Sequence, residues 1–98
     1  MSDERRRYRR IAGPFEGSWD GLTGKRDCRI TELGAGGCFI DTFSHQERGT
    51  GVVVSVLVAG QLFTLPGNIL YTDPVQGFGV QFAEGEARDR LEAALAAL

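Results

Sequence analysis

The chain contains few of the residues on which enzymes and metalloproteins depend. Among its 98 residues are one histidine, two cysteines and one tryptophan. No stretch approaches the roughly 18 consecutive apolar residues that mark a transmembrane helix, and the charged N-terminus lacks the apolar segment of a signal peptide. We therefore expect a soluble cytoplasmic protein that does not enter a membrane.

The scarce residues also lack the spacing that catalysis or metal binding requires. His45 has no second histidine, cysteine pair or nearby acid at metal-ligand spacing, so we interpret it as a solvated loop residue. No catalytic triad, metal-binding set or pair of acids stands in a recognisable frame. Cys28 and Cys38 flank a glycine-rich loop out of register, which predicts reduced core residues without a disulfide. We expect neither an enzyme nor a bound cofactor.

The positive charge is concentrated at the N-terminus. Residues 1–10 hold five arginines against Asp3 and Glu4, a local charge of +3, so that with a net charge of −2 the remaining 88 residues sum to −5. Proteins that bind nucleic acids generally spread positive charge over a whole face, because they neutralise many phosphates. A short basic segment on an acidic body favours a ligand with few phosphates and makes a nucleic-acid partner unlikely.

The composition predicts a single, mainly β domain. A chain of this length supports one modest core, and its 14 glycines, about twice the usual share of ~7%, fall between short apolar runs. We predict strands over residues 14–19, 25–32, 38–42, 52–58, 61–72 and 76–83, with a hairpin turn at Ala59-Gly60. We expect the fifth strand to bend at a bulge at Pro66, because proline cannot donate to a strand ladder.

The two ends of the chain differ from this body. Residues 1–12 lack apolar periodicity and are predicted to form a flexible arginine-rich arm before a domain spanning 13–98. Residues 84–98 are predicted to be helical, with one apolar stripe made by Ala87, Leu91, Ala94, Leu95 and Leu98. Because so short a helix is marginal alone, it must pack on the domain or form a dimer contact.

Two motifs are candidates for binding. Arginines lie four apart at Arg5/Arg9 and Arg6/Arg10, and the segment Glu32-Leu33-Gly34-Ala35-Gly36-Gly37 is half glycine. Glycine permits close approach of the backbone to a ligand, but a tight corner between two strands explains the composition equally well. The spacing alone leaves both interpretations open.

Together these motifs resemble those of the PilZ family, receptors for the bacterial second messenger cyclic di-GMP. Arg6 and Arg10 match the Arg-x-x-x-Arg arm of the family. The segment from Glu32 to Gly37 matches its Asp/Asn-x-Ser-x-x-Gly loop, with Glu32 in place of Asp or Asn, Gly34 in place of Ser, and Gly37 kept. The run Gly77-Phe78-Gly79-Val80-Gln81-Phe82 is similar to the closing Gly-x-Gly-Val-x-Phe strand. The resemblance covers nearly the whole chain.

The resemblance implies a six-stranded antiparallel β-barrel with a C-terminal helix, which would cover an open end of the barrel. It also implies a cyclic di-GMP sensor whose arm folds over the ligand and whose altered surface engages a protein effector, as a monomer or weak dimer. Arginine forks bind phosphate oxygens and guanine O6/N7, and Glu32 would accept a hydrogen bond from a guanine edge. The ligand-binding residues implied are Arg5, Arg6, Arg9, Arg10, Glu32, Gly34, Gly36 and Gly37.

Two other functions remain open. The substitutions at Glu32 and Gly34 are compatible with a PilZ-like adaptor that binds proteins without the nucleotide. A small nucleic-acid-binding β-barrel would instead use Phe15, Trp19 and Phe39 to stack on bases, although the acidic body argues against it. A calorimetric titration with cyclic di-GMP distinguishes the sensor from both.

Overall fold

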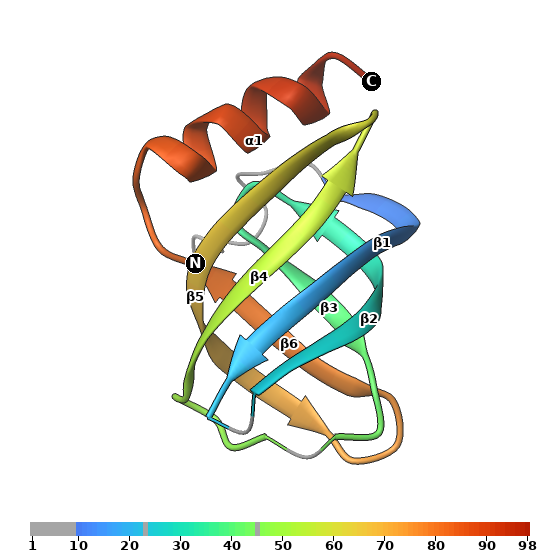
Figure 1. The fold of residues 1–98 in the computed structure, drawn as a ribbon, viewed down its shortest axis with the longest axis vertical. Coiled ribbons are helices and arrows are strands. Elements are labelled where there is room, and N and C mark those ends of the chain that lie inside the picture. Colours follow the sequence, from blue (N-terminus) through green and yellow to red (C-terminus); the bar gives the residue numbers. More distant parts are fainter. Residues whose placement is uncertain (1–9, 23, 45) are drawn as a thin grey trace, which may run out of the picture.

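The computed structural model describes residues 10–22, 24–44 and 46–98, and in it six antiparallel strands form a closed barrel (Figure 1). The strands follow the barrel in the order β1-β2-β3-β6-β5-β4, and one helix follows the last strand. Their bounds are β1 Ile11–Gly21, β2 Gly24–Gly34, β3 Gly37–Asp41, β4 Gly51–Val58, β5 Gln61–Asp73, β6 Gly77–Phe82 and α1 Glu86–Ala96. The predicted fold is confirmed. No helix in these ranges is long and apolar enough to cross a membrane.

The alternation of side chains along the strands explains why the sheet closes. In β4, Val52, Val54, Val56 and Val58 are buried, while the residues between them are partly exposed. This is the period of two that places one face of a strand inside a barrel. At the centre, the rings of Trp19 and Phe78 meet edge to face with centroids 5.2 Å apart. The buried apolar residues of the core cluster come from all six strands.

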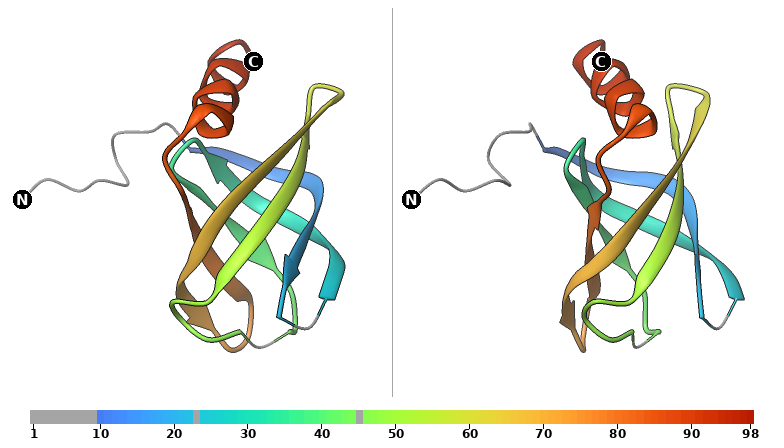
Figure 2. Two further views of the ribbon diagram at one scale, coloured as in Figure 1. Left: turned by 60° about the vertical axis from the view of Figure 1, so that its left-hand side comes forward. Right: turned by 90° about the vertical axis from the view of Figure 1, so that its left-hand side faces the viewer.

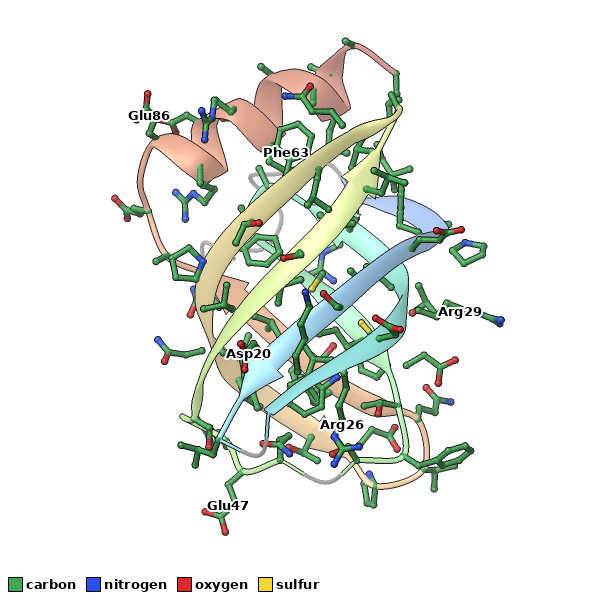
Figure 3. All side chains as sticks on the ribbon, viewed as in Figure 1. Asp20, Arg26, Arg29, Glu47, Phe63 and Glu86 are labelled. Atoms are coloured by element: carbon green, nitrogen blue, oxygen red, sulfur yellow. The ribbon has the colours of Figure 1, made fainter. Side chains whose placement is uncertain are left out.

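The helix α1 lies across one end of the barrel, beside β5 (Figures 1 and 2). Leu91 and Leu95 are buried in the core cluster, with Ala87 and Ala94 packed partly against it, and Phe63 projects from β5 beneath the helix (Figure 3). Leu98, at the end of the predicted stripe, is 58% exposed. The apolar stripe thus packs on the barrel, which is one of the two arrangements that the sequence predicts for the helix.

Two details of the predicted strands are wrong. The strand β1 begins at Ile11, inside the segment 1–12 assigned to the arm; Arg10 precedes the strand, and residues 1–9 lie outside the described residues. The bulge predicted at Pro66 is absent, because Pro66 pairs with Val53 in unbroken register and its carbonyl accepts a hydrogen bond from the Ala83 N–H (2.9 Å). The fifth strand bulges instead between Ile69 and Tyr71.

The hairpin turn at Ala59-Gly60 is confirmed. Both residues have positive φ, 51° and 82°, as the tight turns that match the twist of a β-hairpin require. This turn sets the register of β4 with β5, so that Leu57 lies opposite Leu62.

Candidate ligand-binding site

The glycine-rich segment is a tight hairpin and not an open loop. Gly34 pairs with Gly37, which leaves Ala35 and Gly36 as the two turn residues between β2 and β3. Ala35 is buried, and the Gly36 carbonyl accepts a hydrogen bond from the Phe82 N–H (2.9 Å). The turn is therefore fixed to the end of β6, and Glu32 and Gly34 are strand residues.

Packing within the barrel accounts for Gly37. A Cβ built at Gly37 would lie 2.1 Å from the Val80 carbonyl oxygen of the neighbouring β6, closer than any real side chain approaches. Gly34 is different in one useful respect, since it is not among the positive-φ residues of the described chain, and a serine there would suit the backbone. Gly37, the glycine that the hairpin shares with the family loop, is thus required by the packing of the barrel whether or not a ligand binds.

An ion pair brings the arm and the hairpin together. Arg10 Nη1 donates to Glu32 Oε1 at 2.5 Å, across 22 residues of sequence, and the two side chains are 43% and 47% exposed. Glu32 lies opposite Ala12 of β1 and Phe39 of β3. The structure thus unites two of the predicted site residues. Arg5, Arg6 and Arg9 lie outside the described residues.

A pocket of about 320 Å³ opens beside Glu32 on the outer surface of the barrel. Its walls come from β2, β3, β5 and the turn before β6, and its lining residues are Thr31, Glu32, Phe39, Tyr71, Asp73 and Gln76. Of these the sequence analysis had proposed Glu32 as a ligand contact and Phe39 only for nucleic-acid stacking. Phe39 faces outward by the simple alternation of β3 between the buried Cys38 and Ile40, which is a signal in the sequence, whereas Tyr71 lies against the alternation of β5.

Two β-bulges turn the walls of this pocket outward. Strict alternation from the buried Ile30 would place Glu32 inside, but a bulge between them moves the next buried position to Leu33. In β5 the bulge after Ile69 likewise turns Tyr71 to the surface, where it is 41% exposed. Bulges are commonly found beside binding sites because they redirect a side chain in this way.

Phe39 and Tyr71 form an aromatic shelf on the floor of the pocket. Their rings stack with centroids 6.0 Å apart and an interplanar angle of 29°, a geometry typical of favourable aromatic pairs. Both pair with Gly79 of the intervening β6, and a Cβ on Gly79 would lie 2.4 Å from the Tyr71 ring. The absence of a side chain on Gly79 therefore lets the tyrosine ring lie over the middle strand.

Asp73 holds a carboxylate in a fixed position at the far side of the pocket. Its Oδ1 accepts hydrogen bonds from the N–H groups of Val75 (2.9 Å) and Gln76 (3.1 Å), closing the turn between β5 and β6 in the manner of an Asx-turn. No described residue hydrogen-bonds to Oδ2. The pocket thus combines an aromatic surface with acceptors on two sides.

The cysteines are free, as predicted, and do not form a reactive site. Cys38 is buried and Cys28 half-buried; burial, with a smaller contribution from Asp27, raises the pKa of the Cys28 thiol to about 11, and burial raises the pKa of Cys38 further. Neutral thiols are poor nucleophiles and poor ligands. No cluster of potential metal ligands occurs in the described ranges, and His45 lies outside them.

The surface proposed for nucleic-acid stacking does not exist as predicted. Trp19 is fully buried, in the edge-to-face contact with Phe78, and Phe15 packs partly buried against the core. Phe39, the third of these residues, lines the pocket beside Glu32. The structure thus removes the observation on which the nucleic-acid interpretation depended.

A second and larger hollow, of about 500 Å³, lies elsewhere on the barrel surface. It is lined by Glu16, Gly17, Ser18, Lys25, Asp27, Cys28, Ser55, Leu57 and Leu62. None of these belongs to the arginine or hairpin motifs. The smaller pocket beside Glu32 is therefore the better candidate site despite its size.

Comparison with known proteins agrees with the fold. The sequence model of the PilZ domain matches residues 4–97. The PilZ domain of CeSA from a cellulose-synthesising bacterium superimposes with a TM-score of 0.68 at 16% identity, covering 90% of this chain and 98% of that one. The Bacillus subtilis inhibitor of motility MotI/DgrA gives a TM-score of 0.76 at 12% identity over 99% of this chain, which spans about half (53%) of that protein. No curated protein matches the sequence significantly.

Proposed function

The chain belongs to the PilZ domain family, and we propose that it binds cyclic di-GMP where Arg10 meets Glu32. The proposal rests mainly on the ion pair between Arg10 and Glu32, because in this pair an arginine of the segment that resembles the family's arm contacts the hairpin that resembles the family's loop. A pocket opens at the same position. The role proposed is binding and signalling, without catalysis.

Arg10 supplies the phosphate contact. Its guanidinium is an always-charged fork whose N–H groups match two phosphate oxygens, and it is exposed enough to reach a ligand. From the family motif, which pairs Arg6 with Arg10, we propose Arg6 as a second fork, with Arg5 and Arg9 as further cations of the arm. Gly34, Gly36 and Gly37 belong to the hairpin that follows Glu32 but are not among the residues that line the pocket.

Binding exchanges one partner of Arg10 for another. A solvent-exposed ion pair contributes about 0–1 kcal/mol, whereas a hydrogen bond to a charged group contributes roughly 1.5–3 kcal/mol. A phosphate that replaces Glu32 beside Arg10 is therefore favoured. The exchange releases Arg10 from Glu32, and the altered surface is what a protein effector would recognise.

The substitution at Gly34 weakens this binding without preventing it. Relative to the family's serine, Gly34 keeps its backbone N–H and lacks the hydroxyl. One neutral hydrogen bond contributes about 1 kcal/mol, which corresponds to roughly fivefold to tenfold in affinity. The arginine contacts exceed this loss.

Isothermal titration calorimetry with cyclic di-GMP tests the proposal. The parent should bind, and Arg10→Ala should weaken binding by ~1.5–3 kcal/mol, the contribution of one charge-assisted contact. The matched control is Arg48→Ala, which removes an exposed arginine from the connection between β3 and β4 and should leave the affinity unchanged. Equal affinities for the parent and Arg10→Ala would show that Arg10 is not in the site.

A second candidate function is an adaptor that binds a protein partner without nucleotide. The specific observation in its favour is that Glu32 already neutralises Arg10, while Gly34 lacks the hydroxyl of the family loop. In that case the ion pair would stabilise a permanent surface. A folded parent that shows no heat of binding to cyclic di-GMP at high protein concentration would select this function.

A further inference from the structure

The pocket beside Glu32 has the size and chemistry of a site for one base. Its volume of about 320 Å³ lies near the lower end of the ~300–1,000 Å³ typical of small-molecule sites. A whole cyclic dinucleotide would not fit inside it, but one planar base would, with the sugar-phosphate ring outside. Arg10 stands beside Glu32 at the edge of this pocket, where such a ring would pass.

The aromatic shelf provides the surface on which a base would stack. Tyr71 is 41% exposed, although its ring covers Gly79 and contacts Phe39. If the shelf served only to cover Gly79, a small apolar side chain at position 71 would suffice. A planar ring that stays accessible beside a pocket is instead suited to stacking, which contributes similarly for every base because each has a π-face.

The hydrogen-bonding groups around the shelf distinguish one base from another. The Asp73 carboxylate is positioned through Oδ1, and no described residue occupies Oδ2. Guanine presents two adjacent donors, N1–H and the 2-amino group, which a carboxylate accepts. Adenine presents an amino donor beside the N1 acceptor. A carboxylate oxygen would therefore place its lone pair against the lone pair of adenine N1, which is repulsive.

We infer that this pocket holds one guanine, stacked on Phe39 and Tyr71 and hydrogen-bonded to the Asp73 carboxylate, and that it sets the base specificity of the site. The inference rests on the proposed function, because cyclic di-GMP is the guanine-containing ligand. It assigns base recognition to residues of β3 and β5 that lie outside the arginine and hairpin motifs. Gln76, which follows Asp73 in the same turn, also lines the pocket.

The test compares cyclic di-GMP with cyclic di-AMP, which shares its ring and phosphates. The parent should prefer cyclic di-GMP by about tenfold or more, since a hydrogen bond to a charged group is replaced by repulsion. Asp73→Asn keeps an Oδ1 to close the turn and puts an amide N–H₂ where Oδ2 stood. It should therefore reduce the preference about tenfold, mainly by weakening cyclic di-GMP. Asp20→Asn, the same change at an exposed position of β1 away from the pocket, is the control and should leave the preference intact.

Variants of the shelf separate stacking from folding. Tyr71→Leu keeps an apolar cover over Gly79 but removes the ring, and should weaken both dinucleotides by at least about fivefold, whereas Tyr71→Phe should bind like the parent. Melting temperatures identify any loss caused by unfolding. If the parent binds cyclic di-GMP while Asp73→Asn and Tyr71→Leu bind it equally well, the inference is wrong and the proposed function stands. If the folded parent binds neither dinucleotide, both are wrong.

Discussion

The ion pair between Arg10 and Glu32 yields a prediction whose sign decides how the site works. If Glu32 competes with the ligand for Arg10, then Glu32→Gln should tighten cyclic di-GMP binding, because the amide removes the negative charge that attracts Arg10 while keeping the shape of the side chain. If Glu32 is instead the acidic acceptor that the family loop implies, the same change should weaken binding. We predict tighter binding, since the carboxylate is already engaged with Arg10 at 2.5 Å.

The exposure of the pair limits the size of the effect. With side chains 43% and 47% exposed, the pair should contribute at most about 1 kcal/mol to the ligand-free state. Removing that contribution should lower the dissociation constant by up to about fivefold. The free energy of unfolding should fall by no more than the same ~1 kcal/mol. Because salt screens the pair in the parent, the difference between variant and parent should shrink at high ionic strength.

Calorimetry at two salt concentrations, with denaturant unfolding of each protein, measures all three quantities. The control is Glu47→Gln, which removes the same charge at the end of the barrel opposite α1 (Figure 3). It should change neither the affinity nor its salt dependence beyond the small effect of net charge. Binding that is tenfold weaker in Glu32→Gln alone would refute the competition and identify Glu32 as a ligand contact.

Three further predictions follow from the hairpin and the core. Gly34→Ser made with Glu32→Asp should tighten cyclic di-GMP binding about fivefold to tenfold by calorimetry, because the serine hydroxyl of the family loop adds one hydrogen bond and Gly34 lacks the positive φ that would strain a serine. Weaker binding at an unchanged melting temperature would mean that the hairpin recognises another ligand. Gly37→Ala should lower the free energy of unfolding by ~1–3 kcal/mol, since its Cβ would meet the Val80 carbonyl oxygen; denaturant unfolding measures this, and an unchanged stability would contradict the packing explanation. Burial raises the pKa of the Cys28 thiol from 9.0 to about 11, so the unfolded state loses the thiol proton first and the free energy of unfolding should fall as pH rises from 9 toward 11. Denaturant unfolding of a Cys28→Ser variant should lack the part of this fall that Cys28 causes.

Regular alternation and turn chemistry made most of the fold predictable from the sequence. The valines of β4 recur with the period of a strand, and Ala59-Gly60 supplies the turn that returns the chain to β5. The helical stripe likewise identified Leu91 and Leu95 as the residues that pack on the barrel. These features depend on neighbours close in sequence, so the residue order is sufficient to reveal them.

The pocket could not be predicted in the same way, because it depends on where alternation fails. The bulges of β2 and β5 turn Glu32 and Tyr71 outward, against the period that each strand otherwise keeps. No glycine or proline stands at either irregularity to mark it. The proline that does interrupt β5, Pro66, pairs without a bulge. The side chains that form the site are therefore oriented by strand register, which only the closed barrel defines.

The family motif itself combines two kinds of constraint that the structure separates. Gly37 and Gly79 are required by close packing, against the Val80 carbonyl oxygen and beneath the Tyr71 ring, and any chain with this barrel would need small residues there. Arg10 and Glu32 are exposed or half-buried polar residues that the packing of the barrel does not require, and Asp73 contributes to the turn between β5 and β6 through its Oδ1. A match at the glycines therefore establishes the fold, whereas ligand binding depends on the polar residues, and it is at Glu32 and Gly34 that this chain departs from the family. Variants of the polar residues are for that reason the informative ones, since they can change affinity while the barrel remains intact.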